Sequence, residues 1–111
     1  MNQFELFTMI FYVLDAEWDE TQDRILGDFL SGANPFLFED LSSADPEIYK
    51  QFCEIVTEPI TVENSYIIAS KYIASLNSNI ISKAFKSITE DEWVDSVKEF
   101  LSEEHKGETR A

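Results

Sequence analysis

Residues 15–38 read DAEWDETQDRILGDFLSGANPFLF, and this stretch shows how the chain as a whole is built. Five of its first nine residues are carboxylates. Asp19 and Glu20 would interact favourably with the dipole of a helix that starts at residue 19. Apolar residues then recur at helical spacing, at Ile25, Leu26, Phe29 and Leu30. Gly32 is a natural C-cap, and Asn34-Pro35 interrupts a helix. The stretch therefore predicts a helix over residues 19–31 that sets dense negative charge beside apolar side chains.

A second helix is predicted before this stretch, over residues 3–16. Asn2 can act as its N-cap. Its apolar positions follow helical spacing, at Phe4, Phe7, Ile10, Phe11, Val13 and Leu14. Because these positions cover most sides of the helix, we expect it to lie at the centre of the protein.

Four further helices are predicted after the break at Asn34-Pro35. Asp45-Pro46-Glu47 is a strong helix start, Thr61 can cap a helix, and Thr89 with Glu92 matches a capping box. The expected helices are residues 46–57, 62–76, 80–88 and 90–104, with Ile55 and Ile67 on the apolar stripes of the first two. Only three glycines and three prolines punctuate the chain, which argues against hairpin turns and strands.

The length of 111 residues suits one domain. Fifteen aromatic residues (nine Phe, four Tyr and two Trp) give this domain enough apolar surface for a core. The predicted fold is all-α, a single compact bundle of five to six helices over residues 1–104. Residues 105–111 are expected to form a flexible C-terminal tail.

The net charge of −14 comes from 22 acids against 8 bases. Residues 1–58 hold 13 of the acids and only Arg24 and Lys50 as bases, a net of −11. A surface of this sign repels nucleic acid and anionic membranes, so we expect neither as a partner. A basic protein is the natural complement.

The cysteine content indicates a reducing compartment. Cys53 is the only cysteine, so it can form no disulfide within the chain. We expect it to be an inert core residue and the protein to be cytoplasmic. The apolar run at residues 6–14 has no preceding base and no cleavage site, so it is not predicted to be a signal peptide.

No catalytic or metal-binding motif is recognisable. Asp15, Glu17 and Asp19 alternate as in the first half of a calcium loop, but the sixth and twelfth positions are Glu20 and Leu26, where glycine and glutamate are required. The single histidine, His105, has no second ligand or nucleophile beside it. We therefore expect no enzyme activity, no bound metal and no cofactor.

A protein-binding surface is the remaining hypothesis for residues 15–38. The Asn34-Pro35-Phe36 triplet is interpreted as a turn with packed aromatics. Trp18, Phe36 and Phe38 are either buried by packing or, if exposed beside the acids, anchors for a partner. The candidate partner-binding residues are Asp15, Glu17, Trp18, Asp19, Glu20, Asp23, Asp28, Phe36 and Phe38.

Residues 15–38 and the helix start at Ser42, Ala44, Asp45 and Pro46 resemble those of small acidic helical bacterial proteins found beside polymorphic or contact-dependent toxins. Several of those proteins are immunity proteins. The resemblance implies a cytoplasmic inhibitor that binds a basic toxin, often a nuclease, and blocks its active site.

Two alternatives remain open at this point. The chain could be a helical regulatory or structural protein that acts as a homo-oligomer, with acids that serve solubility only. An enzyme with a carboxylate or metal centre ranks last. The expected state is a monomer or a weak homodimer.

Overall fold

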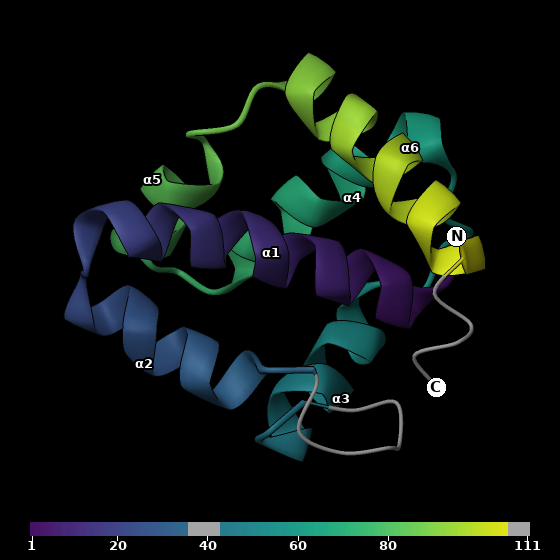
Figure 1. Ribbon diagram of the computed structural model, residues 1–111. Helices are drawn as coiled ribbons and strands as arrows, with labels where there is room; N and C mark the ends of the chain where they lie inside the picture. Colours follow the sequence, from purple (N-terminus) through teal and green to yellow (C-terminus); the bar gives the residue numbers. More distant parts are fainter. Residues whose placement is uncertain (36–42, 107–111) are drawn as a thin grey trace.

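The computed structural model describes residues 1–35 and 43–106, which form six α-helices and no strand. The helices are α1 (Gln3–Thr21), α2 (Arg24–Ala33), α3 (Pro46–Ile55), α4 (Val62–Ser75), α5 (Asn79–Phe85) and α6 (Glu90–Lys106) (Figure 1). The molecule measures 33 × 31 × 28 Å along its principal axes. The predicted all-α bundle is thus confirmed.

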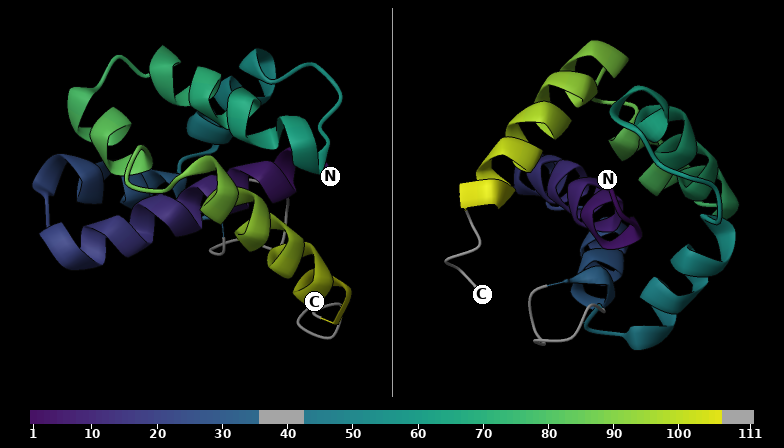
Figure 2. Two further views of the ribbon diagram at one scale, coloured as in Figure 1. Left: turned by 90° about the horizontal axis from the view of Figure 1, so that it is seen from above. Right: turned by 90° about the vertical axis from the view of Figure 1, so that its right-hand side faces the viewer.

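Helix α1 lies at the centre of the bundle. The side chains of Leu6, Phe7, Thr8, Met9 and Ile10 are all buried. Successive helical residues are about 100° apart, so five buried residues in a row mean that this part of α1 is covered on every side. The cover comes from α2, α3, α4 and α5, as the two views of Figure 2 also show. The central position expected for this helix is confirmed.

The first helix is longer than predicted, and the prediction of a helix over residues 19–31 was wrong at its start. Helix α1 continues to Thr21 and ends where Gln22 adopts a left-handed conformation, with φ of 53°. Asp23 then caps α2, because its side chain accepts a 3.0 Å hydrogen bond from the backbone N–H of Leu26. Asp19 therefore lies at the C-terminal end of α1 instead of in the first turn of α2.

The prediction that Gly32 is a C-cap was also wrong. Helix α2 continues through Gly32 to Ala33, and no described glycine has a positive φ. The carbonyl of Gly32 accepts a hydrogen bond from Asp45 N, and that of Asn34 accepts one from Ala44 N, both at 2.8 Å. Because the next segment satisfies these terminal carbonyls, the helix can end without a left-handed glycine.

The predicted N-caps are confirmed. Asn2 and Glu5 form a reciprocal capping box at α1, and Thr89 and Glu92 form one at α6. Asp45 caps α3, and Thr61 caps α4. The C-terminal ends differ by a few residues from those expected: α3 ends at Ile55, α5 at Phe85 and α6 at Lys106. Residues 107–111 of the expected tail lie outside the described part of the chain.

Aromatic side chains form two linked parts of the core. Phe52 contacts both Phe7 and Tyr72, with ring centroids 5.1 and 4.8 Å apart. Phe85 and Trp93 form the second part between α5 and α6, at 5.5 Å. Cys53, which was expected to be a core residue, is half-buried and packs against this core. Within residues 1–35 and 43–106, no helix is long and apolar enough to span a membrane.

Candidate protein-binding surface

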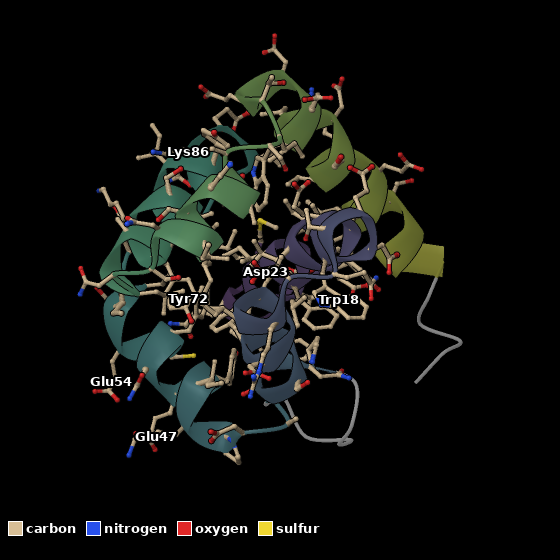
Figure 3. All side chains as sticks on the ribbon, turned by 90° about the vertical axis from the view of Figure 1, so that its left-hand side faces the viewer. Trp18, Asp23, Glu47, Glu54, Tyr72 and Lys86 are labelled. Carbon is tan, nitrogen blue, oxygen red and sulfur yellow. The ribbon has the colours of Figure 1, made fainter. Side chains whose placement is uncertain are left out.

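The hairpin of α1 and α2 carries six carboxylates, and three of them, Asp19, Glu20 and Asp23, lie at or next to its two-residue link. The helices run in opposite directions, so the last turns of α1 lie beside the start of α2 (Figure 1). We use the name acidic tip for this set of carboxylates on the α1–α2 hairpin, which comprises Asp15, Glu17, Asp19, Glu20, Asp23 and Asp28. They lie on more than one face, because Asp15 and Glu17 are about 200° apart around α1. Figure 3 looks onto the link, with Asp23 near its centre and Trp18 to one side.

The six carboxylates differ in exposure. Asp19, Glu20 and Asp28 are exposed, whereas Asp15, Glu17 and Asp23 are half-exposed. Asp15 and Asp19 are four residues apart and share one face of α1. Asp23 has a structural role as well, because its carboxylate caps α2. Five of the six acids are thus free of any role in capping a described helix.

The electrostatics of the acidic tip are unfavourable for the fold. The last turn of α1 holds no base, and the C-terminal end of a helix carries partial negative charge. Arg24 is the single base among residues 1–35. In the described parts of the chain, the one ion pair joins Lys71 to Glu58 at 3.8 Å, away from the acidic tip. Asp19 and Glu20 therefore face the negative end of α1, and no described base forms an ion pair with them.

Trp18 packs between α1 and α2. A Cβ atom added at Gly27 would lie 2.7 Å from the indole Nε1, so only a glycine lets α2 approach the ring this closely. The side chain is half-buried and lies against the core. Packing against Gly27 and the core therefore explains the position of the Trp18 ring. The other two aromatic candidates, Phe36 and Phe38, lie outside the described residues.

Ile25 is a residue that the sequence reasoning placed wrongly. It was expected on the buried face of α2, but its side chain is 55% exposed. The buried face of α2 consists of Leu26, Leu30 and Ala33, spaced by four and three residues, and Ile25 lies about 100° from Leu26 around the helix. The same error applies to Ile55 and Ile67, which are also exposed.

The groups with shifted pKa values lie away from the acidic tip. Burial raises the pKa of Tyr72 to about 12. Burial, and then a hydrogen bond with the Cys53 thiol, raise the pKa of Tyr49. The backbone N–H of Thr89 lowers the pKa of Glu92. Among the described residues, no three His, Cys, Asp or Glu side chains are arranged to hold a metal ion.

These features define an all-α protein with an acidic tip on its α1–α2 hairpin. No family model, curated protein or solved structure matches the chain.

Proposed function

We propose that this chain is an acidic protein-binding module, an immunity protein that neutralises a basic toxin by covering its active site. A nuclease is the favoured class of toxin, because its nucleic-acid groove is positively charged. Binding through the acidic tip would take place in the cytoplasm, and it requires no enzyme activity of this chain.

The observation that supports this proposal is the position of Asp19 and Glu20 in the last turn of α1. Carboxylates there oppose the helix dipole, and no described base pairs with them. Each such charge costs about 0.3–1 kcal/mol at low ionic strength. A role beyond folding would account for charges at positions that destabilise the helix. Steering of a cationic partner is such a role, because concentrated charge raises association rates.

The experiment co-expresses the chain with the protein encoded immediately upstream of it, and measures growth and complex formation. We expect the chain to restore growth and to bind that protein directly. Absence of both would reject the proposal. Light scattering of the purified chain tests the homo-oligomer alternative, which a concentration-dependent increase in mass would favour.

Two matched variants test the role of the acidic tip. The first replaces four tip acids, as Asp15→Asn, Glu17→Gln, Asp19→Asn and Glu20→Gln. The control replaces four exposed acids on α3, α4 and α6, as Glu47→Gln, Glu54→Gln, Glu63→Gln and Glu90→Gln. Both variants lose the same charge. We expect the tip variant alone to associate on the order of tenfold more slowly and with weaker salt dependence. Equal rates for the two variants would reject the steering role.

A further inference from the structure

We propose that Ile25 is the apolar contact of the acidic tip, and that its partner presents an apolar side chain or shallow pocket surrounded by lysine and arginine. This inference rests on the proposed function and adds to it the chemistry of the surface that the partner must carry.

The first support is that folding leaves Ile25 unused. Helix α2 packs on the core through Leu26, Leu30 and Ala33, which are at most 6% exposed. The Ile25 side chain is 55% exposed on the first turn of the same helix. No packing contact in the core depends on it, so its apolar surface is available to another molecule.

The second support is the net negative charge around Ile25. The base that lies beside it in the sequence is Arg24, which is exposed and directly precedes it. Asp23 precedes it by two residues, and the exposed Asp28 follows it by three, on a neighbouring part of the same helix surface. The C-terminal end of α1, with Asp19 and Glu20, lies across the two-residue link. An apolar contact with a charged rim is the usual composition of a specific protein interface.

The charge of the rim decides what can cover Ile25. A second copy of this chain docked symmetrically would bring its own acidic tip against the first, with six carboxylates on each side. Like charges placed together oppose such a contact strongly. Nucleic acid and an anionic membrane are repelled in the same way. A basic protein surface is the occupant that this charge favours.

The two kinds of residue would act on different rate constants. Long-range attraction by the carboxylates sets the association rate, whereas burial of Ile25 lengthens the life of the complex. Loss of one buried isoleucine contact shortens a complex lifetime on the order of tenfold.

The test uses two synthetic peptides of equal length and equal lysine content as probes, one with leucines and one with glutamines between the lysines. The full chain is immobilised, and association and dissociation are followed by surface plasmon resonance. The test variant is Ile25→Asn, and Ile25→Leu should retain binding. Ile67→Asn is the matched control, because Ile67 is 53% exposed on α4, outside the acidic tip.

We expect the leucine peptide to dissociate more slowly than the glutamine peptide from the unchanged chain, and Ile25→Asn to abolish that difference while Ile67→Asn retains it. Equal dissociation of the two peptides, or equal loss in the two asparagine variants, would overturn the inference. Failure to inhibit the upstream-encoded protein would count against the proposed function alone, because the peptide result does not depend on that protein.

Discussion

The indole nitrogen of Trp93 donates a 2.9 Å hydrogen bond to the hydroxyl oxygen of Ser65, and both side chains are fully buried. This bond joins α6 to α4. The Ser65 hydroxyl in turn donates to the carbonyl of Val62 at 2.8 Å. These two hydrogen bonds satisfy the indole N–H, which is the one polar group on Trp93, the largest side chain of the core.

Ser65→Ala should destabilise the protein by about 1–3 kcal/mol, because it leaves the buried indole N–H without an acceptor. Urea unfolding followed by circular dichroism measures the change. In a Trp93→Phe background the same substitution should cost much less, since the donor is absent. Equal costs in the two backgrounds would contradict the role given to this bond.

Gly27→Ala should destabilise the protein by about 1–3 kcal/mol, because the new methyl group lies 2.7 Å from the rigid ring of Trp18. Gly32→Ala is the matched control. Its methyl group would lie 2.7 Å from the terminal Cδ1 of Ile48, which can rotate away, and 3.5 Å from the Cβ of Asp45, which is an ordinary van der Waals contact. The gain in helix propensity, up to about 1 kcal/mol, should then leave Gly32→Ala neutral or stabilising. The same response at both glycines in thermal unfolding would disprove the close contact with Trp18.

Thr8→Val should stabilise the protein by about 1 kcal/mol. The Thr8 hydroxyl is buried and has no hydrogen-bond partner among the described residues, so an isosteric methyl group removes a desolvation cost. Thr8→Ser keeps the hydroxyl and loses a packed methyl group, so it should destabilise. The free energy of unfolding in urea distinguishes the two, and a destabilising Thr8→Val would show that the hydroxyl has a partner after all.

Asp19→Asn and Glu20→Gln should each raise stability by about 0.3–1 kcal/mol at low salt, because they remove negative charge from the C-terminal end of α1. Glu47→Gln provides the opposite control, since Glu47 lies in the first turn of α3, where its charge is favourable. Added salt should shrink both effects by screening. Thermal midpoints at two salt concentrations test this, and stabilisation by all three substitutions would contradict it.

Alkaline pH should destabilise the protein through Tyr72. Its pKa is raised from 10.0 to about 12 by burial, so the folded state holds the phenol proton more tightly than the unfolded state does. The contribution to stability is complete below pH 10 and is lost as the pH rises towards 12. Tyr72→Phe should weaken this loss without a large change at neutral pH. An unchanged alkaline transition in the variant would show that burial does not raise the pKa of Tyr72 in the folded state.

The helix starts could be predicted from the sequence because a cap is a local arrangement. Thr89 and Glu92 are three residues apart, and both hydrogen bonds of the box form within that distance. Asp45 and Pro46 act in the same local way at α3. Such signals depend on few neighbours, so they were correct at α1, α3, α4 and α6.

The boundary between α1 and α2 could not be predicted in this way, because a tertiary contact decides it. Trp18 packs on Gly27 in the next helix, which requires α1 to continue past Trp18 before the chain turns. Gln22 takes the left-handed conformation without being glycine or asparagine, so the sequence offers no turn signal there. Ile25 and Leu26 fit a helical stripe equally well, and only the neighbouring helices determine which of them is buried.

The cover around α1 has a consequence for synthesis in the cell. The buried segment from Leu6 to Ile10 is synthesised before α5, which forms part of its cover and ends at Phe85. While the chain is still growing, this apolar segment lacks part of its cover until α5 has left the ribosome. During that interval its apolar side chains are open to aggregation or to capture by a chaperone.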